Sequence, residues 1–253
     1  MSTLDGARVL VTGAGSGIGA AIAAEVVRCG GTVAVNDLDP AAAAGTCAGI
    51  GSAAVPVPGD VSTPDGAAAV VASAVDALGG LTGLVNNVGI VRGGPLRTLS
   101  VTEWDLVMRV DCGSALYCAQ AGYPHLAAAS GAIVNLSSLC GVFAAPFAGS
   151  YNAAKAAVIS LTQQLALEWG GDGIRANAIA PGIVSGTNFS ASSQDPAVAA
   201  RRGPALPLGR TGRAEDIAPV AAFLLGDGAR YMTGQVLVVD GGLGIALQTL
   251  LPA

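Results

Sequence analysis

The chain contains a single lysine, and that lysine stands four residues after a tyrosine. The segment "YNAAK" lies in a helical pattern, so Tyr151 and Lys155 project from one face of a helix, one turn apart. An ammonium group beside a phenol favours the phenolate and moves the tyrosine pKa toward the range of a general base. Upstream, the strand pattern "AIVNLSS" ends in Ser138, whose hydroxyl can donate to a carbonyl or alkoxide oxygen. These three side chains predict a site that handles a substrate hydroxyl.

All other cations of the chain are arginines. A guanidinium is planar and permanently charged, so it does not reproduce a compact ammonium beside a phenol. We therefore interpret Lys155 as a position where chemistry requires lysine.

A second group of candidate residues lies near the start of the chain. The strand pattern "RVLVT" runs into "TGAGSGIG" (12–19) and then a helix. Glycines there allow a tight turn and let backbone N–H groups approach a pyrophosphate, although any strand-to-helix corner can use glycine for positive φ. Asp37 ends the next strand, close to the spacing of about 20 residues at which an acid binds the adenosine ribose. The predicted dinucleotide site comprises Gly13, Gly15, Ser16, Gly17, Ile18, Gly19, Asp37 and Leu38.

Asp37 also predicts the type of cofactor. A carboxylate accepts hydrogen bonds from ribose hydroxyls and repels a 2′-phosphate, and the neighbouring Ser16 and Leu38 supply no compensating cation. We therefore expect NAD rather than NADP.

Two further strand ends, "GDVS" (59–62) and "NNVG" (86–89), contribute to the same expected site. In open parallel sheets, ligands bind beyond the carboxyl ends of the strands. The predicted cofactor contacts there are Asp60, Val61, Asn87 and Gly89. For Asp60 and Asn86, turn or capping chemistry is an equally weighted alternative, and the two roles are compatible.

Alternating strand and helix patterns must position these residues. Strand patterns occupy 8–12, 32–36, 53–57, 81–85, 132–136, 174–179 and 236–240; helical patterns occupy 17–29, 40–48, 64–78, 101–122, 151–169 and 214–225. Parallel strands need crossover helices, so we expect one α/β domain over 1–253, a Rossmann-type doubly wound parallel sheet of about seven strands with helices on both faces. The segment 185–212 is too long for a simple connection and predicts an insertion over the substrate site. The apolar tail after Gly242 is expected to pack on its own sheet or on another subunit.

Composition excludes several classes of function. The chain has 253 residues, is 52% hydrophobic and carries a net charge of -5, with scattered arginines that form no surface for nucleic-acid phosphates or anionic membranes. No apolar run reaches the roughly 18 residues that span a bilayer, and the N-terminus lacks a signal-peptide pattern, which favours a cytoplasmic location. The five cysteines lack CxxC spacing, which indicates reduced thiols and no metal site.

The ordered motifs together resemble the short-chain dehydrogenase/reductase family, in its classical NAD-binding group. They are "TGAGSGIG", Asp37, "DV" (60–61), "NNVG", Ser138, "YNAAK", "IRANAIAPG" (174–182) and "MTGQVLVVDGG" (232–242). The resemblance implies hydride transfer between NAD and a secondary alcohol or ketone. It further implies that Tyr151 exchanges a proton with the substrate oxygen, that Ser138 orients this oxygen, and that Lys155 binds the nicotinamide ribose and lowers the tyrosine pKa.

The chain departs from the family pattern at two positions. Asp111 stands where the family usually has an asparagine that supports a proton relay; either its charge alters the titration of the site or it only bonds local backbone. Where the family commonly has threonine, this chain has Gly186, with Thr187 next. The resemblance also implies that Asp111 is a catalytic candidate and that the cofactor contacts include Pro181, Gly182, Ile183 and Thr187.

The sequence also predicts features of the substrate pocket and of the assembly. We expect a pocket wall formed by Leu139, Cys140, Val142, Phe147, Ile183 and Phe189, and therefore an apolar or mixed substrate. Alternatives to alcohol oxidation are a 3-ketoacyl-thioester reductase of the same family and an NAD-binding regulator without turnover. The resemblance implies a homotetramer, with helices 101–122 and 151–169 paired across one interface.

Overall fold

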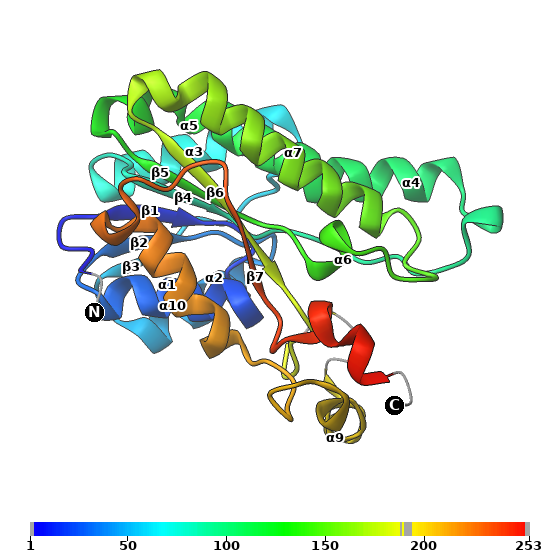
Figure 1. The fold of residues 1–253 in the computed structure, drawn as a ribbon. Helices are drawn as coiled ribbons and strands as arrows, with labels where there is room; N and C mark the ends of the chain where they lie inside the picture. Colours follow the sequence, from blue (N-terminus) through cyan, green and yellow to red (C-terminus); the bar gives the residue numbers. More distant parts are fainter. Residues whose placement is uncertain (1–2, 188, 190–193, 251–253) are drawn as a thin grey trace.

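The computed structural model describes residues 3–187, 189 and 194–250, and these form a seven-stranded, wholly parallel sheet (Figure 1). The strands are β1 (Arg8–Val11), β2 (Thr32–Val35), β3 (Ala54–Pro56), β4 (Gly83–Asn86), β5 (Ala132–Leu136), β6 (Arg175–Pro181) and β7 (Val236–Val239). Their order across the sheet is β3-β2-β1-β4-β5-β6-β7. The predicted strands and doubly wound arrangement are confirmed.

Helices cover both faces of the sheet (Figure 1). They are α1 (Gly17–Arg28), α2 (Pro40–Ile50), α3 (Pro64–Leu78), α4 (Val101–Met108), α5 (Ser114–Ala129), α6 (Leu139–Val142), α7 (Tyr151–Trp169), α9 (Pro196–Arg202) and α10 (Ala214–Leu225). One apolar core lies between the sheet and α1, α2 and α10, and a second lies between the sheet and α3, α5 and α7. Because both faces are covered, the strands are almost continuously apolar rather than alternating. None of the described helices is long and apolar enough to cross a membrane.

Local sequence signals explain where several helices begin. The Asp39 side chain accepts from the Ala41 N–H before α2, Thr63 accepts from the Gly66 N–H before α3, and Ser100 accepts from the Glu103 N–H before α4. Each of these short polar side chains satisfies an N–H group that has no partner within its helix.

The predicted helix 101–122 differs from the structure in two respects. A π-helical turn, Arg109–Gly113, separates α4 from α5, and α5 continues past Pro124 to Ala129. Proline removes one helical hydrogen bond, and burial of Leu126 beyond it in the second core offsets part of this loss. The π-turn matters for function because it contains Asp111.

The two ends of the segment 185–212 meet just beyond the carboxyl end of β6. Ser185 N donates to Gly212 O over 2.9 Å, and Gly212 N donates to Ile183 O over 2.9 Å. Between these ends lies α9, below the carboxyl edge of the sheet in Figure 1. Residues 188 and 190–193 of this predicted insertion lie outside the described residues.

The tail after Gly242 forms a 3-10 helix, Leu243–Leu250. Gly244 approaches the side chains of Phe143 and Leu139 so closely that a Cβ there would lie 2.9 Å and 3.3 Å from them. The tail therefore packs on the segment that contains α6, and Ile245 is 85% exposed.

Candidate active site

A continuous cleft of about 870 Å³ lies at the carboxyl ends of the strands. It contains most of the residues predicted from the sequence: Gly13, Ser16, Gly17, Ile18, Asp37, Leu38, Asp60, Val61, Asn87, Gly89, Ser138, Tyr151, Lys155, Pro181, Gly182, Ile183 and Thr187. Three predicted residues, Gly15, Gly19 and Asp111, do not line it, and each supports a residue that does. The cleft therefore joins the expected cofactor end and the expected chemical end.

The turn after β1 is built so that backbone can face the cleft. Gly13 and Gly17 have left-handed φ values of 61° and 57°, which side chains rarely adopt. A Cβ on Gly19 would lie 2.5 Å from Gly13 O and 2.6 Å from Asn87 Nδ2, so the first turn of α1 packs directly on the loop. The N-terminus of α1 therefore lies at the cleft, and the N-terminus of a helix is a position that suits a pyrophosphate.

Asp37 is held at the opposite side of this turn. Its Oδ2 accepts from Gly15 N over 2.9 Å, and its Oδ1 accepts from Asp39 N over 3.1 Å. A Cβ on Gly15 would lie 2.6 Å from Asp37 Oδ2, so glycine is needed for this contact. Leu38 is 71% exposed, and no described ion pair joins Asp37 to a cation. The carboxylate keeps acceptor capacity for ribose hydroxyls.

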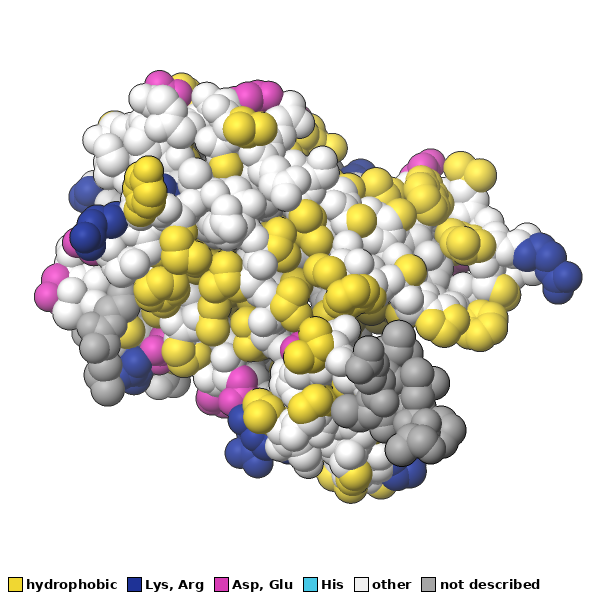
Figure 2. All heavy atoms as spheres, viewed as in Figure 1, with side chains coloured by type: hydrophobic (Ala, Val, Ile, Leu, Met, Phe, Trp, Pro, Cys, Tyr) yellow, Lys and Arg dark blue, Asp and Glu magenta, His cyan; other side chains and the backbone are white. Residues whose placement is uncertain are grey.

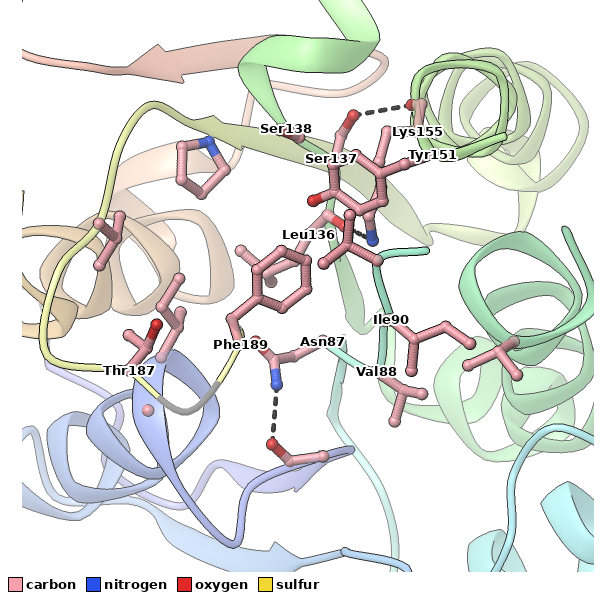
Figure 3. Close-up of a pocket in the computed structure, with 18 of the residues that line it drawn as sticks. Asn87, Val88, Ile90, Leu136, Ser137, Ser138, Tyr151, Lys155, Thr187 and Phe189 are labelled. Atoms are coloured by element: carbon pink, nitrogen blue, oxygen red, sulfur yellow. Dashed lines mark hydrogen bonds between the residues drawn. The ribbon is translucent and has the colours of Figure 1, made fainter. Parts of the chain in front are cut away.

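Two predicted cofactor contacts also perform structural work. Asn87 Nδ2 donates to Thr12 O over 3.0 Å and to Gly13 O over 2.9 Å, which clamps the glycine turn (Figure 3). Asp60 Oδ1 accepts from Ser62 N over 2.8 Å, and this hydrogen bond holds the pKa of Asp60 below its usual value. The turn chemistry considered for Asp60 is therefore present, while both residues still line the cleft.

The chemical end of the cleft combines the end of β5 with the first turn of α7 (Figure 3). Ser138 lies two residues after β5 as the N-cap of α6, and its hydroxyl accepts from the Cys140 N–H over 3.1 Å. Tyr151 begins α7 and is 8% exposed, and Lys155 lies one turn later and is 3% exposed. The Lys155 ammonium lies 5.6 Å from the centre of the Tyr151 ring. The three side chains that the sequence grouped are therefore brought together.

Burial raises the pKa of the Tyr151 phenol. A hydrogen bond with the Ser138 side chain opposes the rise because it favours phenolate, while the negative charge of Asp111 adds to it. The net direction is opposite to the lowering expected from the tyrosine–lysine spacing. That expectation considered Lys155 alone, whereas the folded chain also supplies burial and an anion.

Lys155 is held from three sides. Its Nζ donates to Leu136 O over 3.1 Å and lies 3.4 Å from Asp111 Oδ2, while the Ser137 hydroxyl donates to the Lys155 backbone carbonyl over 2.8 Å. A Cβ on Gly89 would approach Lys155 Nζ to 2.9 Å, so this glycine leaves the space that the ammonium occupies. The lysine is therefore fixed at the floor of the cleft.

The insertion 185–212 contributes the outer side of the cleft. Phe189 packs beside Tyr151 with ring centres 5.6 Å apart, and Thr187 is buried next to Gly17 (Figure 3). Arg202, the last residue of α9, also lines the cleft. Of the predicted pocket wall, Cys140, Ile183 and Phe189 line the cleft, whereas Leu139, Val142 and Phe147 do not. Phe143 and Leu139 instead meet the tail, and Phe147 is 73% exposed.

The cleft is lined by residues of the glycine turn, by Asp37 and by the hydroxyl-bearing group of Ser138 and Tyr151 with Lys155. A short-chain dehydrogenase/reductase family model, described as enoyl-(acyl carrier protein) reductase, matches residues 13–244. The chain belongs to the short-chain dehydrogenase/reductase family. Dehydrogenases of this family use nicotinamide cofactors and act on CH–OH groups.

Similar proteins match this short-chain dehydrogenase/reductase over nearly its whole length. An inactive 2-(S)-hydroxypropyl-CoM dehydrogenase 2 of Xanthobacter autotrophicus is 42% identical over 88% of this chain and 99% of its own. A cis-4-hydroxycyclohexanecarboxylate dehydrogenase of Sinomonas cyclohexanicum is 38% identical over 92% of this chain and 94% of its own. A crystal structure from Sinorhizobium meliloti, provisionally described as a short-chain alcohol dehydrogenase, has a TM-score of 0.89, 38% identity, and coverage of 95% and 97% of the two chains.

The sequence did not reveal the polar side chains that support this short-chain dehydrogenase/reductase site from behind. Asn86 donates to Asn135 over 2.8 Å, and Asn135 donates to Thr162 over 2.8 Å, so β4, β5 and α7 are joined by a buried chain of hydrogen bonds. Arg109 donates to the Ser62 hydroxyl over 2.7 Å and lines the cleft beside Asp60. The apolar strand pattern interrupted by Asn86 and Asn135 was the one available signal. Among the described residues no group of His, Cys, Asp and Glu side chains could hold a metal ion.

Proposed function

We propose that the protein is an NAD-dependent oxidoreductase that interconverts a secondary alcohol and a ketone, with Tyr151 as general acid and base. The observation that carries this proposal is the convergence of Ser138, Tyr151 and Lys155 at one end of a cleft whose other end contains Asp37. A bound nicotinamide cofactor supplies the hydride acceptor or donor. The protein itself supplies position and proton transfer.

Each side chain of the chemical end has a distinct task. The Ser138 hydroxyl donates to the substrate oxygen and places it beside the Tyr151 phenol. Tyr151 accepts the hydroxyl proton as the alcohol is oxidised and returns it as the ketone is reduced. Lys155, fixed by Leu136 O, offers its remaining N–H donors to ribose hydroxyls. Phe189 packs beside Tyr151 and restricts water at the proton-transfer position.

We expect the enzyme to prefer NAD over NADP by about 10²-fold or more in kcat/KM. Asp37 lines the cleft and has no ion-pair partner among the described residues, and a 2′-phosphate a few ångströms from a carboxylate is repelled by several kcal/mol in a partly screened site. Steady-state rates with each cofactor measure the ratio. The Asp37→Ser variant provides the matched comparison, and it should reduce the ratio chiefly by weakening NAD binding. Equal efficiency of the wild-type enzyme with both cofactors would contradict this assignment.

The reaction class is tested by NADH formation from a panel of secondary alcohols chosen by shape and charge. Turnover with NAD supports the dehydrogenase. Reduction of 3-ketoacyl thioesters with NADPH, in the absence of alcohol oxidation, would support instead the 3-ketoacyl-thioester reductase predicted as an alternative. Binding of NAD without turnover of either class would support the non-catalytic regulator. The intact Ser138, Tyr151 and Lys155 set favours the dehydrogenase over the regulator.

We further propose that the substrate carries an anionic group bound by Arg202. Three cations line the cleft; Arg109 donates to Ser62 and Lys155 pairs with Asp111, whereas Arg202 has no ion-pair partner among the described residues. Two relatives are named as dehydrogenases of a hydroxycyclohexanecarboxylate and of a hydroxypropyl-CoM, which agrees with an anion site.

Replacing Arg202 by glutamine should raise KM for a hydroxy acid about tenfold, since hydrogen bonds to a charged group contribute roughly 1.5–3 kcal/mol. KM for a neutral alcohol of similar shape should not change. Arg201→Gln is the matched control because Arg201 is exposed on the same helix and does not line the cleft. A rise in the KM of NAD instead would place Arg202 at the cofactor phosphates.

The homotetramer and the cytoplasmic location remain predictions. Exposed apolar side chains support an assembly: Val101 of α4 is 75% exposed and Leu167 of α7 is 86% exposed. Figure 2 shows apolar side chains gathered on the middle of the viewed face, with charged side chains mostly toward its edges. Such surface favours association with other copies of the chain.

A further inference from the structure

Asp111 is a buried carboxylate directly behind the site. It lies in the π-helical turn Arg109–Gly113 and is 2% exposed. Its Oδ1 accepts from Ile90 N over 2.8 Å, and its Oδ2 lies 3.4 Å from Lys155 Nζ with no hydrogen-bond partner of its own. One oxygen therefore bonds local backbone while the other faces the lysine, so the contacts of Asp111 are not limited to local backbone.

The surroundings leave Lys155 as the cation that can balance this carboxylate. The titratable groups that interact with Asp111 or with Tyr151 are Lys155 on α7, Cys140 on α6, and Cys112 beside Asp111. Burial raises the pKa of the Cys112 thiol, so this residue stays neutral. Burial also raises the pKa of Asp111, and the Lys155 ammonium and the Ile90 N–H oppose that rise because they favour the ionised form.

We propose that Asp111 is a positioning residue, whose carboxylate pairs with Lys155 and shifts proton release from Tyr151 to higher pH than a neutral side chain would. The carboxylate offsets the lysine charge that would otherwise favour the phenolate. The ammonium lies beside Gly89, near this carboxylate, and donates to Leu136 O. The pair therefore tunes the balance of the enzyme between oxidation and reduction. This inference rests on the proposed role of Tyr151.

The test is the pH dependence of kcat/KM for alcohol oxidation in the Asp111→Asn variant of the whole protein. Asparagine can still accept from Ile90 N, and only the charge is lost. Oxidation requires the deprotonated tyrosine, so the rising limb should shift to lower pH by roughly one unit. Asp105→Asn is the matched control because Asp105 is exposed on α4, does not line the cleft, and should leave the profile unchanged. An unshifted limb in Asp111→Asn would overturn the proposal.

A second measurement does not depend on turnover or on the folding of Asp111→Asn. Infrared spectra at neutral pH report whether a buried carboxyl is ionised. Lys155→Met removes the counter-ion, so a protonated carboxyl band should appear that the wild-type protein lacks, and it should vanish in Lys155→Met/Asp111→Asn where that variant folds. The same spectrum in the wild type and Lys155→Met would show that the charges are not paired. An inactive wild type that shows the expected bands would contradict the proposed function but not the pairing.

Discussion

Replacing Tyr151 by phenylalanine should lower kcat for alcohol oxidation about 10³-fold, because the variant loses the group that accepts the substrate proton. Phenylalanine retains the ring, which packs 5.6 Å from the ring of Phe189. The fold and the binding of NAD should therefore be preserved. Rates of NADH formation, together with thermal unfolding and NAD titration, separate lost chemistry from lost structure.

Tyr231→Phe is the control for the Tyr151 prediction. Tyr231 is fully exposed, so removal of its hydroxyl should leave both kcat and stability unchanged. If Tyr151→Phe kept a kcat within a few-fold of the wild type, another group would have to transfer the proton. The geometry offers Ser138 as the next hydroxyl, and Ser138→Ala would then identify it.

The Lys155→Arg variant should lose at least ~10²-fold in kcat/KM while remaining folded. The ammonium occupies a small space between Leu136 O, Asp111 and the Gly89 backbone, and a planar guanidinium cannot fill it without moving the contacts that place the ribose and the phenol. Overpacking of this kind costs about 1–3 kcal/mol of the free energy of unfolding, which a domain of ordinary stability tolerates. Steady-state kinetics and denaturant unfolding measure the two effects.

A surface arginine replaced by lysine is the control for Lys155→Arg. Arg97 is exposed and does not line the cleft, so Arg97→Lys should have no effect on rate. Lys155→Met, which removes the charge, should be at least as slow as Lys155→Arg. Near-normal turnover of Lys155→Arg would mean that the site needs only a positive charge, and the presence of a lone lysine would then have no catalytic explanation.

Much of the architecture was predictable because it depends on local pattern. Runs of β-branched residues alternate with amphipathic segments that begin at capping residues such as Thr63 and Ser100. For most strands and helices, the bounds predicted from this pattern lie within a few residues of the observed ones. Parallel pairing then follows from the alternation itself. The glycine turn with Asp37, and the four-residue spacing of Tyr151 and Lys155, were readable for the same reason.

The sequence by itself determined the family and the alternation of strands with helices, and it predicted the candidate residues of the chemical end, because all of these depend on residue type and short-range spacing. Only the tertiary structure decided that Asp111 faces Lys155, that Asn87 clamps the glycine turn, and that the Tyr151 pKa is raised. Desolvation and through-space charge depend on which distant segments pack together. No spacing along the chain contains that information.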